Sequence, residues 1–162
     1  SDGGSVTGEA PMIADANYKA DPQPDRVSKA QDIRAALNSE QSSVVDARPA
    51  ARFFADVPEP RAGLKSGHMP GAHNLPFGAL LNDDGTMRAA DEIAALFTGA
   101  GADLKHPITT TCGSGVTAAV LSLALETIGH RRHSLYDGSW AHWGDEGNAE
   151  RDFPVTAGKG RR

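Results

Sequence analysis

The sequence has little cysteine, no excess of positive charge and no long apolar run. One cysteine, Cys112, stands among 162 residues, which excludes an internal disulfide and a metal site built from several cysteines. Acidic side chains outnumber basic ones by 21 to 16; this argues against a nucleic-acid binder, because phosphate backbones need clustered cations. The longest apolar stretch, residues 118–125, is broken by Ser122 and is far shorter than the roughly 18 residues of a membrane span. With no signal segment visible at the start, we expect a cytoplasmic protein with neither nucleic-acid nor membrane partners.

The length of 162 residues suits one domain with a sizeable hydrophobic core, so no disulfide or metal is needed to compensate for small size. Residues 1–25 contain several glycines and prolines and little periodicity, which predicts an extended N-terminal arm or linker. Residues 26–157 form the predicted domain, and residues 158–162 a flexible tail.

Within the domain, strand-like and helix-like segments alternate. Residues 43–46 and 108–111 are apolar or β-branched runs that predict buried strands. Residues 117–128 are apolar almost all round and predict a buried helix. An earlier helix is expected to begin after Ser28 as its N-cap. The alternation predicts an α/β fold whose mainly parallel sheet is covered on both faces.

Cys112 occupies the tight loop between the second predicted strand and the buried helix. Its glycines, Gly113 and Gly115, let successive backbone N–H groups turn inward and form a nest for an anion. The helix N-terminus adds partial positive charge at the same place. We therefore expect a lowered pKa and a reactive thiolate at Cys112. A buried structural cysteine is the alternative, which the flanking glycines and the strand-to-helix position disfavour.

Two chemistries could use such a loop. A phosphatase of the Cys-x5-Arg type needs an arginine at position 118, which is Ala118, and residues 112–117 contain no lysine or arginine. A dianionic phosphate would therefore lack a counter-charge. A sulfur atom carried on Cys112 as a persulfide would accept the backbone N–H groups without a cation.

The loop Cys112-Gly113-Ser114-Gly115-Val116-Thr117 resembles the active loop of the 3-mercaptopyruvate sulfurtransferases, a branch of the rhodanese superfamily. Other stretches agree in order and spacing, and together they cover residues 44–155. These are Val45-Asp46-Ala47-Arg48, Pro58-Glu59-Pro60-Arg61, Ser66-Gly67-His68-Met69-Pro70-Gly71-Ala72, Asn74-Leu75-Pro76-Phe77 and Tyr136-Asp137-Gly138-Ser139-Trp140. The resemblance is to the C-terminal, catalytic domain of a two-domain enzyme. It implies the rhodanese-like three-layer α/β/α fold.

The resemblance also implies roles for individual residues. Cys112 matches the nucleophile that carries sulfur, and Ser114 matches a residue that could stabilise or protonate the leaving pyruvate enolate. Arg52 and Arg61 match two substrate-binding arginines, the second typical of the mercaptopyruvate branch. The remaining loop positions are Gly113, Gly115, Val116 and Thr117.

The implied reaction moves sulfur from 3-mercaptopyruvate through a Cys112 persulfide to a thiol or cyanide and releases pyruvate, with no metal or organic cofactor. The acceptor could be a thioredoxin-like protein, and a sibling rhodanese domain could precede this one. Two alternatives stay open: thiosulfate as the sulfur donor, and a non-catalytic module that carries persulfide or binds a partner.

Less functional interpretations apply to several of these side chains. Arg52 and Arg61 could be solvated loop cations, and Ser114 could merely shape the loop. Arg48 is expected to bond with Asp46 or neighbouring backbone, which is a structural role.

Overall fold

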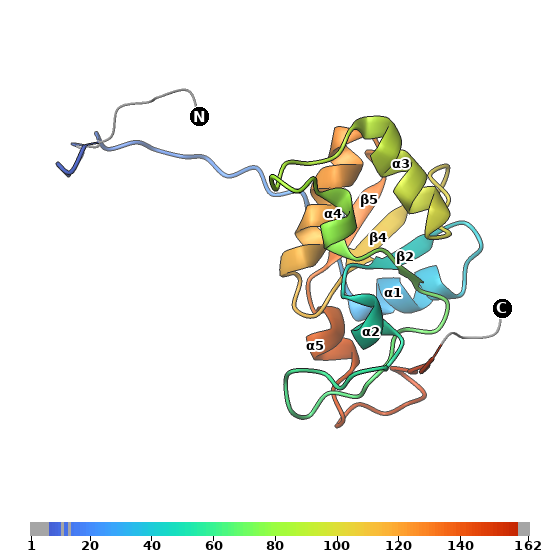
Figure 1. Cartoon of the computed structure of the whole chain (residues 1–162). Coiled ribbons are helices and arrows are strands. Elements are labelled where there is room, and N and C mark those ends of the chain that lie inside the picture. The colour runs from blue at the N-terminus through green and yellow to red at the C-terminus, as the bar shows by residue number, and fades with distance from the viewer. Residues whose placement is uncertain (1–6, 11, 13, 159–162) are drawn as a thin grey trace.

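The computed structural model describes residues 7–10, 12 and 14–158. Its centre is a five-stranded sheet in the order β1-β5-β4-β2-β3, and every pair of neighbours is parallel (Figure 1). The strands are β1 (Val27–Ser28), β2 (Ser43–Asp46), β3 (His73–Asn74), β4 (Ile108–Thr111) and β5 (His133–Tyr136). The predicted α/β fold with a parallel sheet is confirmed.

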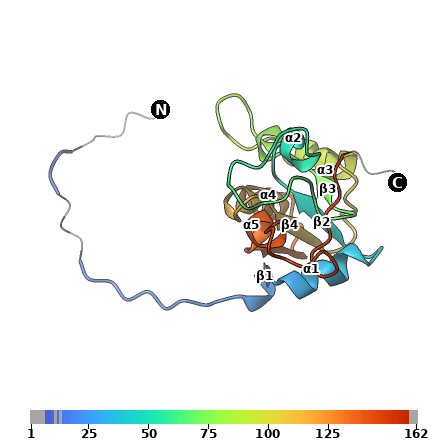
Figure 2. The same cartoon turned by 90° about the horizontal axis from the view of Figure 1, so that it is seen from below.

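Helices cover both faces of the sheet (Figure 2). One face carries α3 (Ala90–Gly99), α4 (Val116–Thr127) and the 3-10 helix η2 (Phe77–Leu80), and its core includes Phe97 and Leu121. The other face carries α1 (Ala30–Leu37) and α5 (Ser139–Trp143), and its core includes Ile33, Trp140 and Trp143. The remaining short helices are η1 (Pro24–Arg26) and α2 (Ala50–Phe53).

The pairing register brings chemically useful residues to one edge. Asp46 at the end of β2 pairs with Thr111 at the end of β4, and also with Asn74 of β3. Because all strands are parallel, their carboxyl ends meet at this edge, where α/β proteins commonly bind ligands. Cys112 follows Thr111 directly and therefore lies there.

The described residues that precede the domain, 7–10, 12 and 14–25, are exposed, and the segment extends away from the sheet (Figure 1). Of the predicted tail, only Gly158 lies within the described residues. No helix in the described ranges has the length and apolar character needed to cross a membrane.

The expected N-cap of α1 was wrong. Lys29 occupies that position, and the Asp32 carboxylate accepts its backbone N–H at 2.7 Å. Ser28 instead belongs to β1, where it pairs with Tyr136 and its hydroxyl bonds that of Ser134 at 2.7 Å. Strand pairing with β5, a contact between residues far apart in the sequence, decides the role of Ser28.

Candidate active site

The Cys112 loop surrounds the thiol with backbone N–H groups. The Sγ atom accepts the N–H of Gly115 at 3.1 Å and that of Ser114 at 3.4 Å. Gly115 is also the N-cap of α4, so the positive end of that helix lies at the same place. The sequence prediction of inward-turned amides at this loop is confirmed.

The two glycines of the loop lie in close surroundings, and the backbone of Gly115 specifically favours glycine. Gly115 has φ of 87°, and a Cβ there would lie 3.2 Å from Oδ1 of Asp137 and 3.3 Å from the Asp137 carbonyl oxygen. A Cβ on Gly113 would lie 3.1 Å from Nη2 of Arg52. The loop therefore has glycine where the backbone must turn left-handed and where the Arg52 guanidinium comes close.

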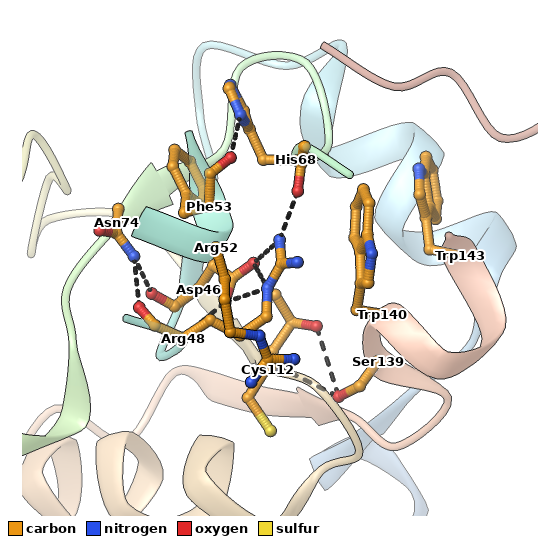
Figure 3. A network of polar contacts seen from close by, with 12 residues as sticks. Asp46, Arg48, Arg52, Phe53, His68, Asn74, Cys112, Ser139, Trp140 and Trp143 are labelled. Atoms are coloured by element: carbon orange, nitrogen blue, oxygen red, sulfur yellow. Dashed lines mark hydrogen bonds and ion pairs between the residues drawn. The ribbon is translucent and has the colours of Figure 1, made fainter. Parts of the chain in front are cut away.

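Helix α5 lies beside the loop and is hydrogen-bonded to it (Figure 3). The Ser139 hydroxyl accepts the backbone N–H of Cys112 at 3.2 Å and donates to the Tyr136 carbonyl at 2.9 Å. Trp140 donates its backbone N–H to the Cys112 carbonyl at 2.8 Å, and Ala141 donates to the Gly113 carbonyl at 2.9 Å. Ser139 is fully buried and has φ of 47°, an unfavourable value for a residue with a side chain. Its contacts make it a support of the loop that the sequence analysis did not identify.

Cys112 is 2% exposed, and burial by itself would raise the pKa of its thiol. Hydrogen bonds from the Thr117 hydroxyl and from the backbone N–H groups of Ser114, Ala118 and Thr117 favour the thiolate. They outweigh burial and lower the pKa of Cys112 below the ordinary value of a thiol. The loop thus stabilises the form of cysteine that acts as a nucleophile.

Arg52 reaches the loop from α2. Its guanidinium lies beside the Cys112 loop (Figure 3), close to Gly113, and its side chain is 24% exposed. Nη2 donates to Oε2 of Glu59 at 2.5 Å, and Nε donates to Oε1 of the same carboxylate at 3.2 Å. The arginine is therefore next to the cysteine loop and still accessible to a small molecule.

Arg48 forms the buried support of this region. Its Nε and Nη2 donate to Oδ2 of Asp46 at 2.9 and 2.7 Å, and Nη2 also donates to the Gly67 carbonyl at 2.8 Å. The guanidinium lies over the Trp140 ring, 4.2 Å from its centroid, and Nη1 donates to Oε1 of Glu59 at 2.8 Å. The predicted structural bonding between Arg48 and Asp46 is confirmed. The importance of Glu59 was missed, because its position 11 residues after Arg48 gives no periodic signal.

The other predicted site residues lie in different settings. Ser114 is exposed and Thr117 is half-buried, with its hydroxyl bonded to the sulfur. Val116 is 74% exposed. Arg61 is exposed, and within the described chain no hydrogen bond or ion pair connects it to the cysteine loop. The structure thus brings together Cys112, its loop and Arg52, and leaves Arg61 exposed on the surface.

No group of three or more histidine, cysteine, aspartate or glutamate side chains in the described residues is arranged to hold a metal ion. A stabilised thiolate, a ring of backbone N–H donors and one adjacent guanidinium are what this site offers. Such a group of residues can attack an electrophilic sulfur and then hold that sulfur as a persulfide, with the guanidinium available for an anionic group.

The chain matches the Rhodanese-like domain family over residues 29–146. It is 43% identical to the 3-mercaptopyruvate sulfurtransferase of Escherichia coli (strain K12), over 88% of this chain and 49% of that protein. It is 37% identical to the thiosulfate sulfurtransferase of Gallus gallus, over 88% of this chain and 48% of the relative. The crystal structure of SseA from Escherichia coli, described as a 3-mercaptopyruvate sulfotransferase, superimposes with a TM-score of 0.67 at 41% identity. The match covers 79% of this chain and 47% of that one. The chain therefore spans about half the length of these relatives.

Proposed function

The chain belongs to the rhodanese-like domain family, as the resemblance predicted, and we propose that it is a sulfurtransferase that takes sulfur from 3-mercaptopyruvate onto Cys112. The observation that carries the proposal is the thiol itself. Its sulfur accepts the N–H groups of Ser114 and Gly115 at the carboxyl edge of a parallel sheet, with the guanidinium of Arg52 beside the loop.

In the first step the Cys112 thiolate attacks the sulfur atom of mercaptopyruvate. A bond forms between the two sulfur atoms, the carbon–sulfur bond breaks, and its electron pair leaves with the pyruvate enolate. The enolate then takes up a proton and becomes pyruvate. The exposed hydroxyl of Ser114, or a loop N–H, is the proposed group that stabilises or protonates the enolate.

Arg52 is the proposed carboxylate ligand of this step. The carboxylate and the adjacent ketone of mercaptopyruvate lie in one plane, which a planar guanidinium can hold with two hydrogen bonds. Arg61 is proposed as the second arginine. It has no other partner in the described chain, and its exposure leaves it available to a substrate.

In the second step a thiolate or cyanide attacks the outer sulfur of the persulfide, and Cys112 leaves as a thiolate. The N–H groups that hold Sγ stabilise that leaving group, so the same loop serves both halves of the reaction. The proposed acceptor is a small thiol or a thioredoxin-like protein, and the proposed compartment is the cytoplasm. A sibling rhodanese domain is a further proposed partner, because the relatives are about twice as long as the part of them that this chain matches.

Thiosulfate is the second candidate donor, because one of the relatives is a thiosulfate sulfurtransferase. Mercaptopyruvate is preferred here because residues 112–117 contain no cation to balance a dianion. The test is to follow pyruvate release from mercaptopyruvate and sulfite release from thiosulfate under the same conditions, with cyanide as the acceptor. We expect the faster turnover with mercaptopyruvate and none from Cys112→Ser. Equal turnover by that variant would refute the proposal.

A further inference from the structure

Glu59 is a buried carboxylate that the reaction described above does not use. Its side chain is 1% exposed, although it lies in the long loop between α2 and β3. A carboxylate is almost never buried to this extent without paired charges. Its two partners are Arg48, which is itself 1% exposed, and Arg52, which faces the cysteine loop.

A chain of ion pairs connects Glu59 to the sheet. Asp46 at the end of β2 holds Arg48 through two guanidinium nitrogens, and the Gly67 carbonyl and the Trp140 ring hold it further. Arg48 then donates to Oε1 of Glu59 at 2.8 Å. Because Arg48 is enclosed on all these sides, the position of Glu59 is set by the core.

Glu59 in turn fixes the orientation of Arg52. Nη2 of Arg52 donates to Oε2 at 2.5 Å and Nε donates to Oε1 at 3.2 Å, so the carboxylate occupies one edge of the guanidinium. Nη1 has no hydrogen-bond partner in the described residues. A Cβ on Gly113 would lie 3.1 Å from Nη2 and 3.8 Å from Nη1. The end of the guanidinium formed by these two nitrogens therefore lies beside the cysteine loop, and Nη1 is the nitrogen there that Glu59 does not hold.

The charges of this group cancel. Asp46 and Glu59 supply two negative charges and Arg48 and Arg52 two positive charges, and the loop itself adds no lysine or arginine. Mercaptopyruvate presents one carboxylate to such a site, whereas thiosulfate presents two negative charges. A guanidinium whose charge is already balanced suits the first donor better than the second.

We propose that Glu59 is a positioning residue that fixes Arg52 beside the Cys112 loop and cancels its charge, so that the site favours singly charged sulfur donors over doubly charged ones. The proposal rests on the sulfurtransferase function proposed above. Glu59 contributes no atom to the reaction; it sets the orientation of Arg52, and its negative charge offsets the positive charge of Arg52 at the Cys112 loop.

The first test is a double-mutant cycle read out on the measured pKa of Cys112, obtained from its alkylation rate against pH. Glu59→Gln leaves the charge of Arg52 unbalanced, so the measured pKa of Cys112 falls by about one pH unit. Arg52→Gln leaves the Glu59 carboxylate unbalanced, so it rises. The double variant returns close to the wild-type value. Glu92→Gln, which removes an exposed carboxylate of α3 that pairs with Arg88, is the matched control and leaves the pKa of Cys112 unchanged.

The second test is donor preference. In Glu59→Gln the ratio of kcat/KM for thiosulfate to that for mercaptopyruvate rises about tenfold, because an unbalanced guanidinium attracts a dianion more strongly. Glu59→Asp keeps the charge but is one methylene shorter, so both rates fall while the ratio stays near that of the wild type. A purely structural role would lower both donors equally in both variants, and an unchanged ratio in Glu59→Gln would overturn the proposal.

If Glu59→Gln does not fold, Arg52→Gln and the double variant decide the matter. The double variant lacks the charges of both Glu59 and Arg52 and keeps the Asp46–Arg48 pair. The proposal requires that removing Glu59 from Arg52→Gln lowers the pKa of Cys112, and equal values in the two variants contradict it. Alkylation needs no turnover, so the cycle separates failure of the Glu59 proposal from failure of the proposed activity.

Discussion

Two carboxylates in this molecule are each shared between two arginines, at opposite edges of the same sheet. At the carboxyl edge, Glu59 lies between Arg48 and Arg52; with Asp46 these residues form the Glu59 cluster. At the amino edge, Glu126 pairs with Arg26 at 3.0 Å and with Arg131, and it accepts a hydrogen bond from Nε2 of His133 at 2.9 Å. These four residues form the Glu126 cluster. The pairing is alike, but the Glu59 side chain is 1% exposed and the Glu126 side chain 29% exposed.

The difference in burial decides what each cluster can do. Water screens Glu126 and Arg131, whose side chain is 71% exposed, so their mutual attraction is weak and their positions are loosely fixed. Water screens the charges of the Glu59 cluster little, and hydrogen bonds hold its side chains on several sides. Removing one of these charges therefore leaves a buried partner unbalanced. A buried ion pair with a fixed geometry can orient a substrate-binding arginine. An exposed ion pair, such as that of Glu126 and Arg131, cannot. Four pairs of substitutions test this difference, and they are given from the largest expected effect to the smallest.

The largest contrast is in stability. Glu59→Gln removes one of the two carboxylates that balance the buried positive charge of Arg48. We expect a loss of about 3–5 kcal/mol in the free energy of unfolding. Glu126→Gln makes the same chemical change on the rim and should cost less than about 1 kcal/mol. Denaturant unfolding monitored by the two buried tryptophans measures both. Similar losses in the two variants would mean that burial does not separate the clusters.

The second contrast is in the reaction. Arg52→Ala removes the proposed carboxylate ligand, so kcat/KM for mercaptopyruvate should fall about a hundredfold, as expected for lost charge-assisted hydrogen bonds. Arg131→Ala removes the matching arginine at the other edge and should leave kcat/KM unchanged. Steady-state pyruvate release measures both, and a small effect of Arg52→Ala would remove it from the substrate site.

Arg61 sharpens the comparison within the active edge. It is not held by Glu59 or any other described partner, so it must be ordered when substrate binds, and Arg61→Ala should cost only about tenfold in kcat/KM. The loss should be larger with mercaptopyruvate than with thiosulfate. Arg151→Ala, whose side chain is 87% exposed, is the control. Equal losses with the two donors would contradict a role in choosing between them.

The smallest effect concerns one histidine at each edge. Burial, against the opposing effect of the bond to the Phe53 carbonyl, lowers the pKa of His68 below its ordinary value of 6.5. Burial and the charges of Arg26 and Arg131 likewise lower the pKa of His133. In both cases the unfolded chain binds the proton more readily. The contribution of each histidine is therefore complete above pH 6.5 and is lost as the pH falls through the folded-state pKa.

Unfolding free energies at pH values of about 7.5 and 5 measure this loss. We expect a decrease of less than about 1 kcal/mol for each histidine. His68→Asn and His133→Asn should each flatten the pH dependence, and an unchanged slope would show that the histidine does not titrate differently on unfolding. The substitution His68→Asn keeps a side-chain N–H donor for the Phe53 carbonyl, which only accepts.

The parts of the site that follow from local sequence were predictable. Gly113 and Gly115 beside Cys112 predict inward-turned amides, because glycine readily adopts the backbone of such a turn, and the structure places the amides of Ser114 and Gly115 on the sulfur. The parallel sheet was also predictable, since segments with strand and helix patterns alternate along the chain. Sequence patterns therefore predict those features that depend on residues close together in the chain.

Contacts between distant residues were not predictable. Ser28 was expected to cap a helix, but pairing with Tyr136 draws it into a strand. Helix α5 has only five residues and begins at Ser139 in a left-handed conformation, which no periodic pattern indicates. Glu59 looked like one member of a loop motif, and its burial between two arginines arises only when the loop folds back over the sheet edge.

The most direct test of the account is the intact mass of the protein after brief exposure to mercaptopyruvate, with thiosulfate in a parallel sample. The account predicts a gain of one sulfur atom, located on the peptide that contains Cys112, lost on treatment with cyanide and absent from Cys112→Ser. It also predicts faster loading from mercaptopyruvate. No gain from either donor, with a Cys112 thiol that titrates like an ordinary cysteine, would contradict the claim that this loop holds a thiolate ready to accept sulfur.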